Sequence, residues 1–184
     1  ETTNDLNFQG FSGLFNVPTG DSLNYGEFHV GYNNLLDGFI SSVSKPSHNF
    51  LYDKGHVVTV STSPFPGLEV GMRNISYNWS QGSDLSANIK YSPTFIPEDW
   101  FQLAIGIQDI GGSTNDLDAR FIAVSKQLGD FRFTIGTGEQ KVKQPGLIAP
   151  RYDGGFYGVE YQPYEWAALL AEHDGVNTTY GLKF

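Results

Sequence analysis

Apolar and polar residues alternate with a period of two along most of the chain. In residues 101–108 every second residue is aromatic or aliphatic, and residues 131–136 repeat this pattern around Arg132 and Thr134. Such a period is that of a β-strand with one apolar face. A change of phase at Asn74 and Ile75 predicts a β-bulge in the third strand. Applied along the whole chain, the pattern predicts strands at 25–32, 55–62, 68–77, 85–91, 101–108, 120–128, 131–136, 155–162, 166–174 and 178–184.

The connections between these strands alternate in character. Those after the second, fourth, sixth and eighth strands are tight or bounded by proline, whereas those after the first, third, fifth and seventh are longer and more polar. This alternation is typical of an antiparallel meander whose two ends face different compartments. The sequence therefore predicts an all-β fold, an antiparallel up-and-down transmembrane β-barrel of about 10 strands spanning residues 23–184. Residues 1–22 form an N-terminal lead-in, for which a short strand, a plug and an edge cover all remain open.

The strand face opposite the apolar one carries charges of both signs. Four acidic and four basic residues nearly balance there, although the chain as a whole is acidic. A narrow lumen needs such balance, because an unpaired charge inside it loses hydration without gaining a partner. The alternative is an ordinary water-facing surface, as in a soluble β-sandwich. The predicted lumen charge network consists of Glu27, His29, Glu69, Arg73, Lys90, Arg132, Glu160, Glu172 and Lys183.

Aromatic residues gather at or beside the short connections. Barrels in lipid carry Tyr, Trp and Phe where their strands meet the membrane interfaces, so this clustering favours the membrane interpretation. The residues concerned are Phe65, Phe95, Trp100, Phe101, Phe131, Tyr161, Tyr164, Trp166 and Phe184.

Composition and charge exclude several classes of function. The 184 residues include 20 Asp and Glu against 11 Lys and Arg, a net charge of −9, which argues against nucleic acid as a partner. The absence of Cys excludes disulfides and thiolate metal sites, and the four His are too scattered to predict a metal or a cofactor. No apolar run is long enough for a membrane-spanning helix. The polar residues 1–5 are typical of a mature chain after signal-peptide removal, which fits the bacterial outer membrane.

Three groups of residues suggest local chemistry. Residues 115–118 have oxygen ligands at a spacing suited to calcium, although a solvated loop explains them better. A hydrolase built from His29 or His173 with a serine and Glu172 lacks a nucleophile elbow, so we expect no enzyme activity and no catalytic residues. Basic residues in the loop 139–154 either contact lipopolysaccharide phosphates or are simply solvated. They are Lys141, Lys143 and Arg151.

Four segments carry a resemblance to a known family. They are GFSGLFNVPTGDSLNYGEFHVGY at 10–32, LAIGIQDIGGS at 103–113, IAVSKQLGDFRFTIGTG at 122–138 and FYGVEYQPYEWAALLAEHDG at 156–175. The chain resembles one barrel-sized portion of the YjbH-like outer-membrane β-barrel proteins of Gram-negative bacteria, which are associated with exopolysaccharide.

The resemblance implies a porin-like, non-enzymatic envelope component that takes part in exopolysaccharide binding, assembly or passage. Its implied partners are outer-membrane lipid, lipopolysaccharide and polysaccharide, with a homo-oligomer left open. One alternative is a structural or assembly subunit of a larger barrel or an extracellular array. Another is an outer-membrane barrel enzyme acting on lipid or peptide.

Overall fold

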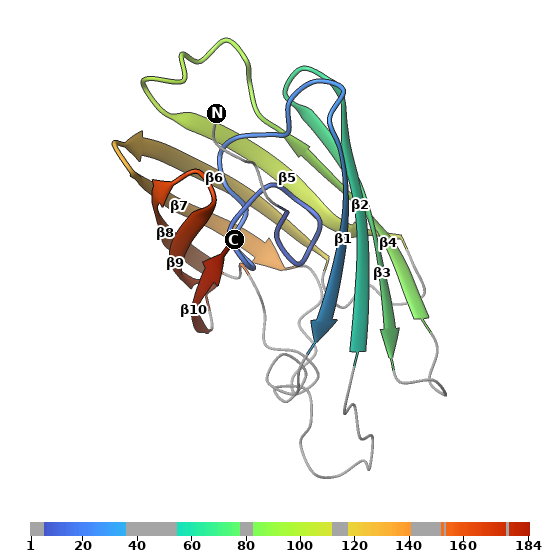
Figure 1. Ribbon diagram of the computed structural model, residues 1–184. Coiled ribbons are helices and arrows are strands. Elements are labelled where there is room, and N and C mark those ends of the chain that lie inside the picture. The colour runs from blue at the N-terminus through green and yellow to red at the C-terminus, as the bar shows by residue number, and fades with distance from the viewer. Residues whose placement is uncertain are drawn as a thin grey trace.

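The computed structural model describes residues 6–35, 55–77, 83–111, 118–140, 152, 154–175 and 177–184. Its strands form one antiparallel sheet of ten, in which each strand pairs with its neighbours in the sequence (Figure 1). This confirms the predicted all-β meander. Within the described ranges, no helix has the length and apolar character needed to cross a membrane. The strands are β1 (Phe28–Leu35), β2 (Gly55–Phe65), β3 (Leu68–Tyr77), β4 (Ser83–Tyr91), β5 (Gln102–Ile110), β6 (Ala119–Leu128), β7 (Phe131–Gln140), β8 (Gly154–Tyr164), β9 (Ala167–His173) and β10 (Thr178–Lys183).

The bulge predicted at Asn74 and Ile75 is wrong. The pairing of β3 with both β2 and β4 runs through these two residues without a shift in register. Ile75 points inward and is buried, while the neighbouring Asn74 points outward, so the backbone keeps its phase and only the chemistry of the two faces changes. Register shifts occur instead between β2 and β3, between β4 and β5, and between β8 and β9.

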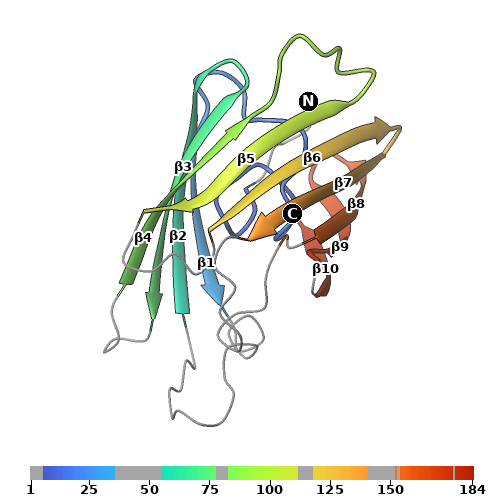
Figure 2. The ribbon, with the colours of Figure 1, turned by 180° about the vertical axis from the view of Figure 1, so that it is seen from behind.

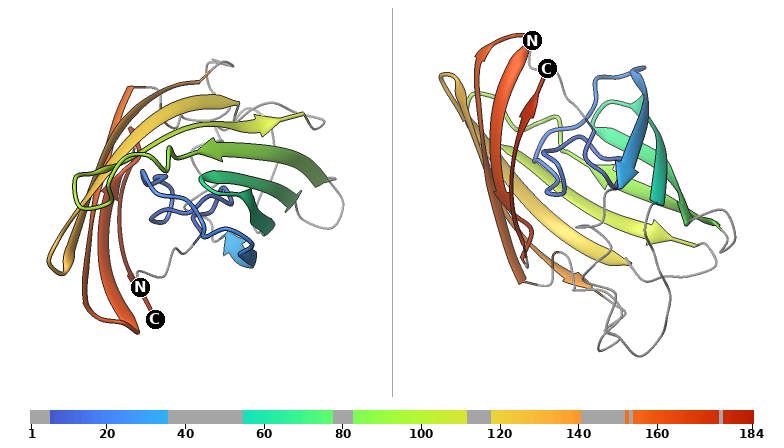
Figure 3. Two further views of the ribbon diagram at one scale, coloured as in Figure 1. Left: turned by 90° about the horizontal axis from the view of Figure 1, so that it is seen from above. Right: turned by 60° about the horizontal axis from the view of Figure 1, so that its bottom comes forward.

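The sheet curls around residues 6–27, which we call the inner segment. Figures 1 and 2 show this segment, in blue, on the concave side of the sheet, and Figure 3 shows the strands bending around it. Two isolated bridges, Leu6 with Ser12 and Gly13 with Pro18, fold the segment back on itself. It therefore occupies the space that a plug would occupy.

Apolar side chains of the inner segment pack against one part of the sheet. The ring of Phe11 meets that of Phe121 on β6 edge-on, with centroids 5.3 Å apart. Leu14 lies so close to Gly158 that a Cβ on that glycine would be 2.2 Å from Leu14 Cδ1. A side chain on β8 at this point would require Leu14 to move. The buried apolar cluster is Phe11, Leu14, Val17, Ala119, Phe121, Ala123, Tyr152, Phe156, Ala168 and Leu170.

The two faces of the sheet differ sharply in polarity. Lys90, on the concave face, is 0% exposed, whereas Ile105, on the convex face, is 53% exposed. The same contrast recurs along β7, where Arg132 and Thr134 are buried between outward-facing aromatic and aliphatic residues. The charged face is thus the inner one, which is the reverse of a soluble sandwich.

The first and last strands are the edges of the sheet. In the part of the chain that the structure describes, β1 pairs only with β2 and β10 only with β9. Residues of these edges that face inward, such as His29 and Thr179, are only half-buried, whereas inward residues in the middle of the sheet are buried. Figure 3 shows the opening between the two edges.

Candidate functional site

Glu69 on β3 holds the first turn of the inner segment. Its carboxylate accepts hydrogen bonds from Ser12 N at 2.6 Å, Ser12 Oγ at 2.8 Å and Leu23 N at 3.3 Å. Lys90 lies directly opposite Glu69 in the register of β3 and β4, and its Nζ is 3.2 Å from the same carboxylate. Lys90 also donates to the Ser12 carbonyl at 2.9 Å. The cross-strand ion pair is therefore shared with the backbone of the inner segment.

Glu172 on β9 holds the second turn in the same way. Its carboxylate accepts hydrogen bonds from Phe15 N at 3.1 Å, Asn16 N at 2.9 Å and Val17 N at 3.2 Å. The side-chain amide of Asn16 adds a fourth donor at 2.8 Å. Successive backbone N–H groups that converge on one anion form a nest, which offsets the cost of burying the negative charge. A single side chain thus satisfies three consecutive amides of the inner segment.

Two arginines complete the attachment. Arg132 on β7 donates a hydrogen bond to Asp21 of the inner segment, and both side chains are buried. Arg73 on β3 donates to Gln9 and, at 2.8 Å, to Asp109 on β5. Each guanidinium therefore meets a carboxylate inside the sheet, as a buried charge requires.

The environment of Asp21 keeps this group ionised. Burial by itself acts to raise the pKa of Asp21, but the nearby positive charges of Arg132 and Lys90 act against it. As a result the pKa of the Asp21 carboxyl is lowered from its usual value of 3.8. Asp21 is accordingly a charged partner for Arg132 at neutral pH.

The structure distributes the nine residues of the predicted charge network around the inner segment as separate ion pairs, except Glu172, which binds backbone amides. Besides the contacts above, Glu27 pairs with His29 at 2.9 Å beside the start of β1. Lys183 on β10 lies 3.9 Å from Glu160 on β8 and donates to the Gly13 carbonyl at 2.9 Å. The residues are brought to one face, but the inner segment, and not a continuous chain of side chains, connects them.

Sequence reasoning missed two carboxylates and an amide that complete this arrangement. Strand alternation assigns Asp109 to the outer face, yet its φ of 60° and the register shift between β4 and β5 turn it inward. Asp21 and Gln9 belong to the inner segment, which has no periodic pattern.

Other predicted groups are less informative. Lys141, Lys143 and Arg151 lie outside the described residues, as do residues 115–117 of the calcium alternative. Glu172 and His173 are adjacent in β9 and point to opposite faces of the sheet, so they do not come together as the hydrolase alternative needs. Among the described residues, no group of three or more His, Asp or Glu side chains is placed to hold a metal ion.

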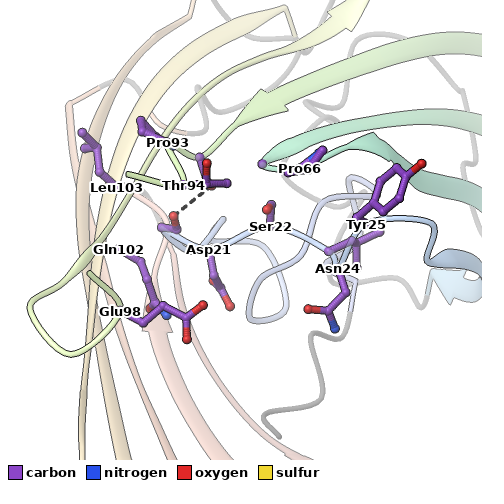
Figure 4. Close-up of a pocket in the computed structure, with 14 residues that line it drawn as sticks. Asp21, Ser22, Asn24, Tyr25, Pro66, Pro93, Thr94, Glu98, Gln102 and Leu103 are labelled. Carbon is purple, nitrogen blue, oxygen red and sulfur yellow. Dashed lines mark hydrogen bonds between the residues drawn. The ribbon is translucent and has the colours of Figure 1, made fainter. Parts of the chain in front are cut away.

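A cavity of about 500 Å³ opens where the inner segment leaves the interior. Its walls are residues 20–25, the β2–β3 turn at Pro66 and Gly67, residues 92–94 and 98 of the β4–β5 connection, and the start of β5. Figure 4 shows Asp21, Glu98 and Gln102 directed toward the same part of this cavity. The cavity lies on the side of the short turns.

Comparisons with known proteins agree on one family. The model of the family described as "Exopolysaccharide biosynthesis protein YbjH" matches residues 5–180. "Uncharacterized lipoprotein YjbH" of Escherichia coli (strain K12) is 26% identical over 198 residues, which cover 91% of this chain and 28% of that protein. The chain therefore spans little more than a quarter of that relative. No solved structure matches this chain.

The nest around Glu172 makes a specific prediction. We expect Glu172→Gln to lower the free energy of unfolding by about 2–4 kcal/mol, because it removes the charge and turns an N–H₂ group toward buried backbone amides. Amide hydrogen exchange at residues 15–17 should also accelerate at least about tenfold. Glu165→Gln, in the exposed β8–β9 turn, is the matched control and should stay within about 0.5 kcal/mol of the parent. Unchanged exchange at 15–17 in Glu172→Gln would contradict this account.

Proposed function

This chain belongs to the YjbH family. From that membership and from its geometry, we propose that the chain forms the wall of an outer-membrane β-barrel, and that its own inner segment occupies the interior of this barrel. Its role is in exopolysaccharide biosynthesis, as a non-enzymatic component that binds or assembles polysaccharide at the envelope. Its partners are outer-membrane lipid and lipopolysaccharide on the outside and polysaccharide at the mouth.

The inverted polarity of the sheet carries this proposal. The outward faces of the strands are lined with Ile, Leu, Val, Phe and Tyr side chains, of which Ile135 is 63% exposed and Leu169 is 52% exposed. A continuous apolar surface of this kind is unfavourable in water and marks contact with another molecule or with a membrane. Antiparallel sheets with apolar residues outside and polar residues inside are the form in which β-structure crosses lipid.

Exposed aromatic residues support the same orientation. Trp100, Tyr164 and Trp166 lie at the short-turn side of the sheet, and the rings of Tyr164 and Trp166 stack with centroids 5.6 Å apart. Toward the long-loop side, Tyr32 stacks on His56 and Tyr157 on His173. Two levels of amphipathic rings separated by aliphatic residues are what membrane interfaces favour.

The filled interior favours binding or assembly over free passage. The inner segment is held to β3, β7 and β9 by ionic and backbone hydrogen bonds, and its apolar side chains are buried. A polymer crossing the interior would have to displace all of these contacts. The interior carboxylates Glu69 and Glu172 bind backbone amides, which leaves them structural rather than catalytic.

A specific observation favours a second candidate, in which the chain is a structural subunit of a larger barrel. The edges β1 and β10 have no strand neighbour on their outer sides among the described residues. Unsatisfied backbone groups of an edge strand are costly in lipid, so these edges need partners. Because β1 and β10 run antiparallel to each other, an all-antiparallel barrel is completed either by direct closure or by an even number of added strands.

The lipid-facing proposal predicts a depth-dependent effect of charge on the outer face. In bilayers, Ile135→Lys, in the middle of β7, should lower the free energy of unfolding by about 2–4 kcal/mol. Leu128→Lys, at the short-turn end of β6, is the matched control and should cost only about 0–1 kcal/mol, because its ammonium can reach the interface. Both side chains face outward and are exposed. Equal, negligible costs for the two variants would show that water and not lipid covers this face.

One engineered disulfide distinguishes direct closure of the ten strands from the larger barrel. The chain has no Cys, so paired substitutions report cleanly: Val30→Cys on β1 combined with either Tyr180→Cys or Leu182→Cys on β10. The larger-barrel candidate predicts no cross-link within one chain after oxidation in the membrane, because at least two added strands separate the two edges. Mass on a denaturing gel with and without reductant measures this. An intramolecular disulfide in high yield would select direct closure of the ten strands and remove the second candidate.

A further inference from the structure

We propose that the cavity at the short-turn end of the sheet is a binding site for a segment of a neutral, hydroxyl-rich saccharide. This inference rests on the proposed function and names the kind of ligand and the place where it binds. The cavity, of about 500 Å³, is large enough for one or two sugar rings. It is formed where the inner segment passes the β4–β5 connection on its way to β1 (Figure 4).

Asp21 lies in the wall of this cavity, and one of its carboxylate oxygens has no hydrogen-bond donor among the described residues. Its side chain is only 8% exposed and its Oδ2 accepts from Arg132, but Oδ1 accepts no hydrogen bond from the described residues. The nearby hydroxyl of Thr19 donates its one proton to the Ser12 carbonyl at 3.2 Å. A buried carboxylate oxygen without a donor is uncommon, and here it gives the wall of the cavity the character of a hydrogen-bond acceptor.

Other polar groups of the cavity add further hydrogen-bond acceptors. Glu98 is exposed and forms no ion pair with a described residue. Gln102 and Asn24 add side-chain amides, each with an acceptor oxygen and an N–H₂ donor. Acceptors on several sides suit a ligand that offers several O–H donors, which is the character of a sugar ring. Asp21 and Glu98 would repel phosphate, sulfate or uronate groups, so the saccharide should be neutral.

Tyr25 gives the cavity an aromatic surface. Its side chain lines the site and is 71% exposed, at the turn between the inner segment and β1. A flat ring with a polar hydroxyl at one end offers an apolar platform for the C–H face of a sugar and a hydrogen bond for its edge. The site thus combines stacking from one side with acceptors from the others. Aliphatic side chains are few in its lining, which disfavours a lipid or another apolar ligand.

The test uses the full chain in a detergent without a sugar headgroup, because glucoside and maltoside headgroups would compete for the site. The probes are cellotetraose and maltotetraose as neutral saccharides, tetragalacturonate as an anionic one and a chitosan tetramer as a cationic one. Calorimetry and saturation-transfer NMR measure binding. We expect at least one neutral probe to bind, and tetragalacturonate to bind at least tenfold more weakly.

Variants at the rim locate the site without disturbing the interior. Tyr25→Ala should weaken binding of the neutral probe about tenfold, and Glu98→Gln should weaken it severalfold, both with unchanged thermal unfolding. The controls are Tyr164→Ala and Asp130→Asn, exposed residues of the same side that lie outside the cavity, and they should bind as the parent does.

Three results would overturn the proposal: no binding of either neutral probe, a preference for the charged tetramers, or binding that Tyr25→Ala and Glu98→Gln leave unchanged. None of these results bears on the proposed membrane orientation of the sheet. If any of these three results is obtained while Ile135→Lys still destabilises the protein in bilayers, the proposed saccharide site is wrong and the proposed membrane orientation is retained.

Discussion

The structure depends on the burial of charged side chains on the inner face of the curled sheet. Glu69, Arg73, Lys90, Arg132 and Glu172 are nearly or completely removed from solvent, and each needs a partner inside. The inner segment provides most of these partners with its backbone amides, carbonyls and Asp21. Sheet and segment therefore specify each other, since Arg132 and Glu172 take their partners from the segment, and the amides of residues 15–17 take theirs from the sheet.

This interior has a consequence for the exterior. Because the charges and the segment occupy the concave side, most of the large apolar residues of the strands lie on the convex side, where no described part of the chain covers them. The same sequence alternation that fills the interior thus leaves the outer face apolar, as the proposed contact with lipid requires. The family description links these proteins to exopolysaccharide biosynthesis, and a sheet whose concave side is filled by its own segment suits the proposed role in binding or assembly.

Much of this architecture was predictable from alternation alone. The ten strands, their antiparallel order and the family resemblance are confirmed. Alternation failed where the backbone departs from a regular strand. The positive φ of Asp109 turns its side chain inward, and no pattern in the sequence predicts this. Asn74 and Ile75, where the alternation changes phase, continue the regular strand.

The inner segment was the other limit of prediction. Its contacts join residues far apart in the sequence, such as Asn16 with Glu172 and Ser12 with Glu69. These contacts follow from three-dimensional proximity and not from any period in residues 6–27. The sequence could therefore indicate that inward charges need partners, but it could not identify Asp21 or the amides of residues 15–17 as those partners.

The central claim is that the convex face lies in lipid, and spin-label accessibility tests it most directly. Single Cys substitutions at Met72, Ile107 and Phe133, outward residues of three different strands, would carry the label in bilayers, with Asp130 in the β6–β7 turn as the reference. The account predicts high collision rates with oxygen and low rates with a water-soluble nickel complex at the three strand positions, and the opposite at Asp130. Nickel accessibility at the strand positions equal to that at Asp130 would contradict it.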